Sequence, residues 1–188
     1  LLCMIDGAKG FTKAIEDKFK ECAFIQRCQQ HKKENVVSYL PQGLQKTYRL
    51  RLMQAYEQTL YPQAKATLNA IALELDRVNP SAAASLKEGM EETLTLHRLG
   101  LSKELRRSFS STNCIESVLS QVGQFTDKVD RWRNGRHIQE WVASSLIRIE
   151  PKLNKVNGWR HLKLLRERMQ NEIHNQMQEE AVLTSSEV

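Results

Sequence analysis

The sequence has few residues that interrupt regular structure, and it has no long apolar run. Its 188 residues include only 4 prolines and 8 glycines, and 40% of them are hydrophobic. No apolar stretch approaches the roughly 18–20 residues that a membrane-spanning helix needs. No basic segment leads into a short apolar run and a cleavage site, as in a secretory signal. These absences favour a cytoplasmic globular protein with no membrane partner, and one domain is the default at this length.

Cysteine is also scarce, and the charges are nearly balanced. The four cysteines (Cys3, Cys22, Cys28 and Cys114) are unevenly spaced within apolar stretches, so we expect buried free thiols and no disulfides. The net charge of +6 and the pI near 9.2 lean towards a polyanionic partner, although many proteins with this balance bind no nucleic acid.

The beginning of the chain has the pattern of a small βαβ unit. Residues 1–5 form a continuous apolar run, which is typical of a strand buried on both faces. Because this run opens the chain without a methionine, we expect a piece of a longer protein. Residues 8–19 have the spacing of a helix, and residues 23–26 predict a second strand. The tight connections predict a parallel pair with a right-handed crossover.

The remainder is predicted to be almost wholly helical. The expected helices cover residues 34–40, 44–60, 62–78, 81 or 85 to 97, 113–129 (with Asn113 as its N-cap), 137–149 and 159–178. A polar linker is expected at 108–112 and a frayed tail at 181–188. The predicted fold class is therefore α/β and predominantly helical, with short strands at the N-terminus and most of the sheet missing from this chain.

Two carboxylates are candidates for metal binding. Asp6 directly follows the first predicted strand, where open α/β sheets place their ligand sites, although Asp6-Gly7 also suits an ordinary turn. Glu116 lies in the first turn of a predicted helix, where the helix dipole and a capping box with Asn113 favour an acid in any case. Each residue has an ordinary structural explanation when it is considered alone.

Four blocks of sequence together resemble the Mutator-type insertion-sequence transposases of bacteria. In chain order these are residues 5–10 (IDGAKG), 26–32 (QRCQQHK), 111–117 (STNCIES), and a set comprising Arg131-Trp132, Trp141 and residues 158–162 (GWRHL). Each block is weak alone, whereas four in register are specific. The chain departs from the family pattern at Ser111, where Thr is frequent. It also lacks the Asn and Arg often seen after the Glu, which puts DNA contacts just after Glu116 in doubt.

The resemblance implies an RNase H-like domain with an Asp-Asp-Glu triad and a helical insertion before the Glu. Asp6 would be the second Asp and Glu116 the Glu, while the first Asp is expected upstream and no acid here replaces it. The implied segments are the C-terminal part of the RNase H-like core sheet (1–40), the helical insertion (41–107), the C-terminal catalytic helices (108–180) and the tail (181–188). Carboxylates of this kind suit Mg²⁺ or Mn²⁺, with two ions in the complete site.

The resemblance further implies metal-dependent cleavage and strand transfer of transposon ends. The partners would be DNA, as terminal inverted repeats and target, and further copies of the full-length protein in a homo-oligomer. Neighbours of the active site are expected at Gly7, Lys9, Cys28, His31, Thr112 and Asn113, and DNA contacts at Arg27, Lys32, Lys33, Arg131 and Arg160. Cys28 and His31 could be half of a zinc site, but no second pair completes it. An inactive transposase remnant and a helical, basic protein-interaction module remain alternatives.

Overall fold

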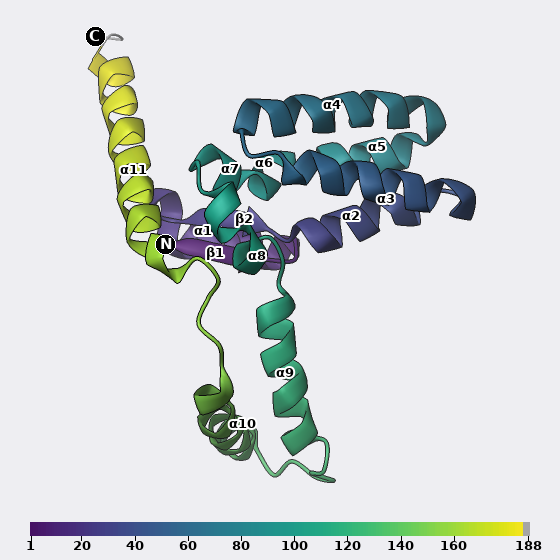
Figure 1. Ribbon diagram of the computed structural model, residues 1–188. Helices are drawn as coiled ribbons and strands as arrows, with labels where there is room; N and C mark the ends of the chain where they lie inside the picture. Colours follow the sequence, from purple (N-terminus) through teal and green to yellow (C-terminus); the bar gives the residue numbers. More distant parts are fainter. Residues whose placement is uncertain (186–188) are drawn as a thin grey trace. The chain divides into compact units, whose positions relative to one another are not determined.

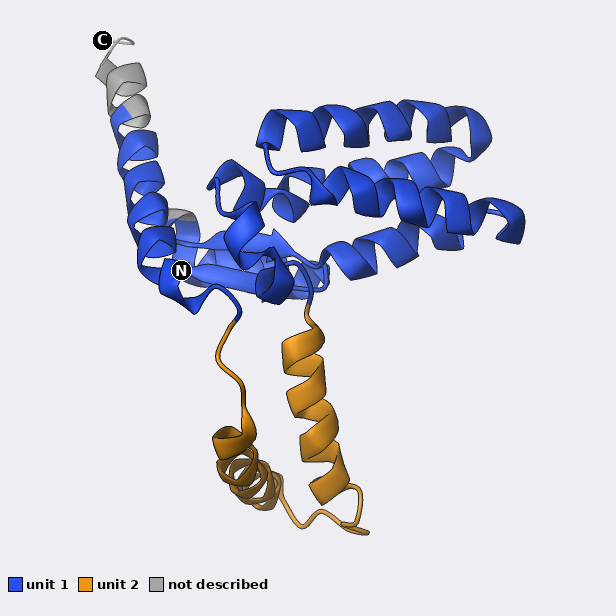
Figure 2. Ribbon diagram, viewed as in Figure 1, with its two compact units in different colours: residues 1–111, 157–188 blue, residues 112–156 orange. Residues whose placement is uncertain are grey.

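The computed structural model describes residues 1–185, except for the side chains of Glu21 and residues 179–185. The chain forms two compact units, unit 1 (Leu1–Ser111 and Asn157–Val188) and unit 2 (Thr112–Val156), coloured separately in Figure 2. The predicted division into segments 1–40, 41–107 and 108–180 concerns function and stays a prediction. The tail expected at 181–188 lies partly outside the described residues.

Unit 1 begins with two short parallel strands that are joined by a helix (Figure 1). Strand β1 (Leu2–Ile5) pairs in parallel with β2 (Phe24–Arg27), with Leu2 opposite Phe24 and Ile5 opposite Arg27. Helix α1 (Lys9–Phe19) and the 3₁₀ turn η1 (Lys20–Cys22) connect them, so the predicted parallel pair is confirmed. The first three residues of β1 are only half-buried, because β2 is its single strand neighbour among the described residues. The prediction of a strand buried on both faces was wrong.

Four helices of unit 1 pack around one apolar core. They are α2 (Gln29–Ser38), α3 (Gln42–Glu57), α4 (Tyr61–Val78) and α5 (Pro80–Lys87). Their apolar stripes bury, among others, Val36, Leu52, Leu68, Ile71, Leu75 and Leu86, and this burial stabilises the bundle. The Asn79 side chain accepts hydrogen bonds from the Ser81 and Ala82 N–H groups. This cap starts α5 at Pro80, one residue before the earliest predicted start.

The helix predicted to continue to residue 97 is interrupted. Gly89 has a φ of 61°, a left-handed conformation that favours glycine, and it separates α5 from α6 (Met90–Thr93). Helix α7 (Thr95–Arg98) follows after Leu94, and α8 (Ser102–Phe109) lies where no helix was predicted. The interruption at Gly89 places the α5–α6 junction against the end of β2, where the candidate site lies.

A second apolar cluster joins the strands to the C-terminal helix. Phe24 packs with Leu96 of α7, Leu105 of α8, Leu99 and Leu101 between these helices, and Leu165 of α11. Helix α11 (Leu162–Ser185) follows the 3₁₀ turn η3 (Trp159–His161) and continues beyond its predicted end at residue 178. This cluster therefore anchors the first residue of β2, Phe24, together with Leu2 of β1.

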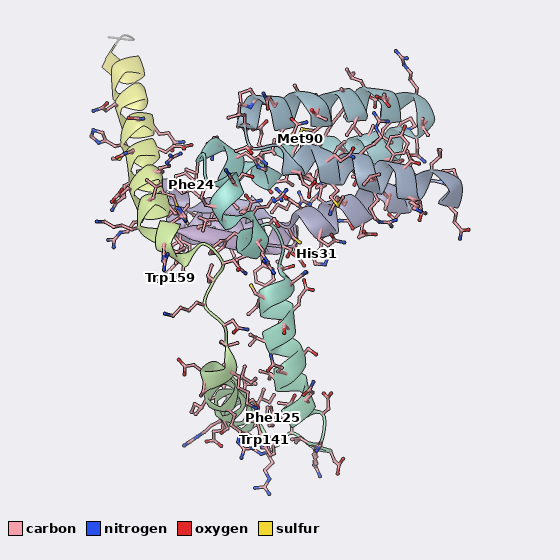
Figure 3. All side chains as sticks on the ribbon, viewed as in Figure 1. Phe24, His31, Met90, Phe125, Trp141 and Trp159 are labelled. Atoms are coloured by element: carbon pink, nitrogen blue, oxygen red, sulfur yellow. The ribbon has the colours of Figure 1, made fainter. Side chains whose placement is uncertain are left out.

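Unit 2 is a helical hairpin of α9 (Asn113–Thr126) and α10 (Gly135–Ile149), which ends in the 3₁₀ turn η2 (Glu150–Lys152). Figure 3 labels Phe125 and Trp141 within this hairpin, and the Arg148 guanidinium lies 5.8 Å from the Phe125 ring centroid. The Asn134 side chain accepts a hydrogen bond from the His137 N–H. This cap begins α10 two residues before its predicted start.

The cysteines test the prediction of buried free thiols. All four cysteines are free thiols, but only Cys28 is buried, while Cys22 and Cys114 are exposed and Cys3 is half-buried. The expectation of burial was therefore wrong for three of them.

Among the described residues, no helix is long and apolar enough to cross a membrane. Two parallel strands and many helices confirm a predominantly helical α/β fold, whereas the RNase H-like core stays a prediction.

Candidate functional site

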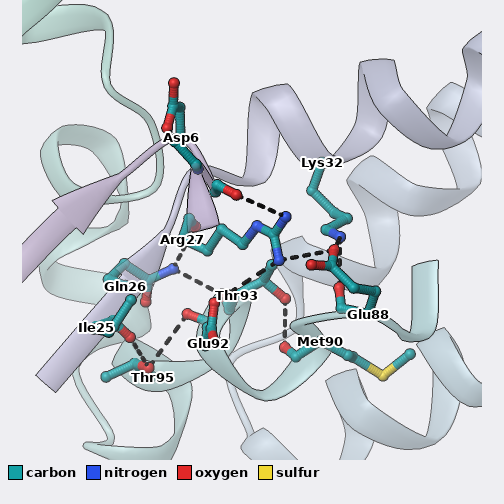
Figure 4. Close-up of polar contacts among 12 residues, drawn as sticks. Asp6, Ile25, Gln26, Arg27, Lys32, Glu88, Met90, Glu92, Thr93 and Thr95 are labelled. Atoms are coloured by element: carbon teal, nitrogen blue, oxygen red, sulfur yellow. Dashed lines mark hydrogen bonds and ion pairs between the residues drawn. The ribbon is translucent and has the colours of Figure 1, made fainter. Parts of the chain in front are cut away.

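Asp6 lies immediately after the carboxyl end of β1 with an exposed side chain. Its Oδ1 atom accepts a hydrogen bond from the Ala8 N–H at 2.9 Å, which closes a tight turn. Gly7 within this turn has a φ of 106°. Figure 4 shows the carboxylate pointing away from the Arg27 side chain. The turn thus holds an accessible carboxylate at the end of a strand, in a defined orientation.

Arg27, the last residue of β2, lies buried beside the Asp6 turn. Its Nη2 donates to the Gly7 carbonyl at 3.4 Å, and its Nη1 lies 2.9 Å from a carboxylate oxygen of Glu88 (Figure 4). Nη1 is also 3.8 Å from a carboxylate oxygen of Glu92. One guanidinium therefore connects the turn after β1 to the α5–α6 junction. Arg27, Lys32 and Glu88 are named the Arg27 cluster below.

Two glycines make the space that Arg27 occupies. A Cβ atom on Gly7 would lie 2.2 Å from Arg27 Nε, and one on Gly89 would lie 2.1 Å from Arg27 Nη1. Both glycines also have positive φ, which other residues adopt only with strain. Any larger residue at either position would therefore displace the guanidinium from its contacts.

Lys32 completes the cluster from α2. Its side chain is buried, and its Nζ donates to the carbonyls of Ser85 (2.7 Å) and Glu88 (2.5 Å) and to the Glu88 carboxylate (2.9 Å). Burial lowers the pKa of the Lys32 ammonium, while the hydrogen bond from Arg27, followed by that from Lys32, lowers the pKa of Glu88 to about 2. In the structure both cations are buried and join β2 and α2 to the α5–α6 junction, and their predicted contact with DNA phosphates stays a prediction.

The Glu88 carboxylate is expected to titrate near pH 2 instead of near 4.5, because two cations stabilise its charged form. The unfolded chain then binds this proton more readily than the folded chain. The contribution of Glu88 to stability is therefore complete above about pH 4.5 and is lost as the pH falls towards 2. A ¹³C NMR titration of the side-chain carboxyl measures the midpoint, and a value near 4.5 would contradict the ion pairs.

Cys28 and His31 occupy the start of α2. Cys28 is the N-cap residue, and its fully buried sulfur accepts a hydrogen bond from the His31 N–H at 3.4 Å. Capping of α2 explains why a side chain with a hydrogen-bond acceptor stands three residues before His31. Lys9 is exposed at the first position of α1, and Lys33 is half-buried, with its pKa lowered by burial.

In unit 2, Glu116 lies in the first turn of α9. The Thr112 hydroxyl donates to Glu116 Oε1 at 2.5 Å, which orients the carboxylate from the N-terminal side. Thr112 is the N-cap residue and Asn113 is the first helical residue, so the predicted capping role of Asn113 was wrong. Arg131 is exposed between α9 and α10. Arg160 is exposed in η3 of unit 1, with its guanidinium 5.6 Å from the Trp159 ring centroid.

The structure groups the predicted site residues within each unit. Unit 1 brings Asp6, Gly7 and Arg27 together, and unit 2 brings Thr112 and Glu116 together. Because Asp6 and Glu116 belong to different units, their joint role in one metal site stays a prediction.

Several residues that hold β2 and the Asp6 turn in place were not predicted from the sequence. Glu88 and Gly89 lie inside what was predicted to be one helix, although a glycine within a helical pattern is a recognised sign of a break. Gln26 was also missed: its buried amide donates to the Thr93 carbonyl at 2.9 Å and accepts from the Leu96 N–H at 2.9 Å. The polar pair Gln26-Arg27 at the end of an apolar run was the available signal.

The sequence is similar to those of known transposases. The family model described as "Transposase, Mutator family" matches residues 1–148. The chain is 28% identical over 128 residues to the transposase for insertion sequence element IST2 of Acidithiobacillus ferrooxidans, which covers 68% of this chain and 42% of that protein. It is 25% identical over 147 residues to the transposase for insertion sequence element IS6120 of Mycolicibacterium smegmatis, with coverage of 78% and 44%.

The chain spans less than half the length of these two relatives. No solved structure matches it. The family match includes β1, the Arg27 cluster, the helical bundle and Glu116, and it extends over well more than half of the sequence. The chain therefore belongs to the Mutator family of transposases.

Proposed function

We propose that this chain contributes Asp6 and Glu116 to a DNA transposase that cleaves and joins transposon ends with the help of divalent metal ions. The observation that carries the proposal is the placement of Asp6. Its exposed carboxylate follows a parallel strand directly, and a glycine turn and the buried Arg27 fix its position. Ligand sites of open α/β sheets lie at this end of the strands.

The chemistry would be two in-line displacements at phosphorus, first by water and then by a 3′-hydroxyl. Carboxylate oxygens are the donors that Mg²⁺ and Mn²⁺ prefer, so Asp6 and Glu116 fit such ions by type. Two bound ions supply activation of the nucleophile and stabilisation of the leaving oxygen. Asp6 would hold metal from its turn, and the Thr112 hydroxyl would keep the Glu116 carboxylate in a fixed orientation.

Two carboxylates are fewer than the site requires in this proposal. Across the described part of the chain, no three His, Cys, Asp or Glu side chains are grouped so that they could hold a metal ion. The third ligand would be the first Asp of the triad, from an upstream part of a longer protein. The isolated chain would then present the scaffold of the site without catalysing the reaction.

The proposed partners are DNA, as terminal inverted repeats and target, and further copies of the full-length transposase. The net charge of +6 favours a polyanion. Among the basic residues predicted to meet phosphates, Lys33, Arg131 and Arg160 remain candidates, since they are at least partly exposed.

Manganese titration of the chain, followed by NMR, tests the shared metal site. We expect paramagnetic Mn²⁺ to broaden the backbone amides near both Asp6 and Glu116, because carboxylates that share a metal pair lie within about 10 Å of each other. Asp6→Asn and Glu116→Gln should each weaken the broadening at both places. Asp17→Asn, which removes an exposed acid of α1, is the matched control and should leave the broadening unchanged.

Broadening confined to the surroundings of one carboxylate would contradict the shared site and favour a protein-interaction module. Broadening at both places, in a gene that encodes no upstream Asp, would identify an inactive remnant.

A further inference from the structure

A polar groove opens beside the Asp6 turn within unit 1. It has a volume of about 580 Å³, which is in the range of ligand-binding sites. Gly7, Arg27 and Glu88 line the end next to the turn, and residues of α1, α2 and α5 form its walls. The groove therefore begins one residue from the candidate metal-binding carboxylate.

Hydrogen-bonding side chains line the walls of the groove. They belong to a lysine of α1, an asparagine and a serine of α2, the tyrosine that ends α2, and two serines of α5. They are Lys9, Asn35, Ser38, Tyr39, Ser81 and Ser85. All of these except the half-buried Ser85 are exposed. Lysine, hydroxyl and amide side chains are the groups that contact the phosphates and sugars of DNA.

The charges around the groove permit an anionic ligand. Glu88 is the acidic residue among those that line it, and Arg27 and Lys32 each lie 2.9 Å from its carboxylate. The two cations offset this negative charge, and Lys9 adds an exposed positive charge at the groove. A phosphate chain would therefore meet hydrogen-bond donors and the exposed ammonium of Lys9.

The walls are also held in place before any ligand binds. The Asn79 side chain donates to the Tyr39 carbonyl at 2.8 Å and caps α5 through its other side-chain atom. This residue thus ties the C-terminal end of α2 to the first turn of α5. The Arg27 cluster ties α2 and the end of α5 to the Asp6 turn. Because these contacts fix the α2 and α5 walls, little ordering of these helices would be needed on binding.

We propose that this groove holds the sugar-phosphate backbone of the DNA strand next to the scissile phosphate. The proposal rests on the proposed role of Asp6, because the groove starts at the neighbouring Gly7. The contacts go to the backbone, so the groove positions DNA of any sequence.

Two exposed alanines on helices give a matched test of the groove. Ala84 of α5 lines it, and Ala70 of α4 lies outside it. Ala84→Glu should weaken binding of the 188-residue chain to a fluorescent duplex oligonucleotide of arbitrary sequence by at least about tenfold, because it sets a negative charge against a phosphate. Ala84→Lys should strengthen binding, and Ala70→Glu should change it little. Alanine, glutamate and lysine all favour helices, so the fold should persist, as circular dichroism can verify.

The salt dependence of binding supplies a second measurement. Lys9→Ala should lower the slope of log K against log salt by about one, since one phosphate contact is lost. Lys13→Ala, at an exposed position of α1 outside the groove, should lower it less.

Equal effects of Ala84→Glu and Ala70→Glu, or the absence of DNA binding by the chain, would overturn the groove proposal. The manganese titration of Asp6 and Glu116 does not depend on these groove residues. A failure of the groove is therefore distinguishable from a failure of the proposed metal site.

Discussion

Replacing Asp6 by asparagine in a longer transposase chain that supplies the first Asp is expected to lower DNA strand cleavage by at least about 100-fold. Changes to residues that only orient metal ligands cost about 10- to 100-fold, so the loss of a ligand should cost at least as much. Glu116→Gln should have an equal effect, because it removes the other anionic ligand of the same proposed site. Cleavage of a labelled transposon end in Mg²⁺ measures both.

Neutral replacements of other exposed acids provide the controls. Asp17→Asn lies on α1 of unit 1, and Glu140→Gln lies on α10 of unit 2, where its carboxylate pairs with exposed Arg136. Both should retain cleavage within a few-fold of the parent protein, since surface ion pairs contribute little. Cleavage that persists in Asp6→Asn at the parent rate would refute the proposed role of Asp6. The present chain alone, without the first Asp, is expected to show no strand transfer.

Local patterns in the sequence were sufficient to predict the frame around Asp6. The abrupt change from the apolar run to Asp6-Gly7 marked the end of β1, and the helical spacing that follows predicted α1. Farther along the chain, the helix predicted at 62–78 matches α4, whose first turn contains Pro62. These features depend only on residues that are close together in the sequence, so the sequence pattern was enough to predict them.

The roles of the basic residues near the site could not be predicted in this way. Arg27 and Lys32 were predicted to contact DNA because a sequence does not distinguish a basic residue that binds phosphate from one that pairs with a distant acid. Their actual partner, Glu88, lies 56 residues beyond Lys32 in the chain. Only the folding of α2 against α5 brings the charges together, and that packing depends on the apolar core and on the break at Gly89.

Helix starts show the same limit on a smaller scale. Thr112 and Asn113 are both good cap residues, so the pattern alone could not choose between them. In the structure Thr112 precedes the helix, and its hydroxyl donates a hydrogen bond to the Glu116 carboxylate. The residue before the helix is therefore also the residue that orients this carboxylate. The sequence pattern therefore did not predict which side chain orients the Glu116 carboxylate.

The Arg27 cluster should be the most sensitive ion-pair group in unit 1, and Glu88→Gln tests this. The change leaves the buried side chains of Arg27 (8% exposed) and Lys32 (1% exposed) without their shared counter-charge. Removing one partner of a fully buried pair costs about 3–5 kcal/mol. Because the Glu88 side chain is 48% exposed, solvent screening reduces the expected loss in free energy of unfolding to about 2 kcal/mol.

Glu74→Gln is the matched control for this substitution. Its carboxylate is exposed to nearly the same extent (49%) and also pairs with an arginine, but that partner, Arg51, is 35% exposed. The loss at Glu74 should therefore be clearly smaller than the loss at Glu88, since water can solvate the cation that remains. Urea unfolding at neutral pH measures both variants. Equal losses would mean that burial of the cations does not make Glu88 important, and that the α5–α6 junction is held to the Asp6 turn by other contacts.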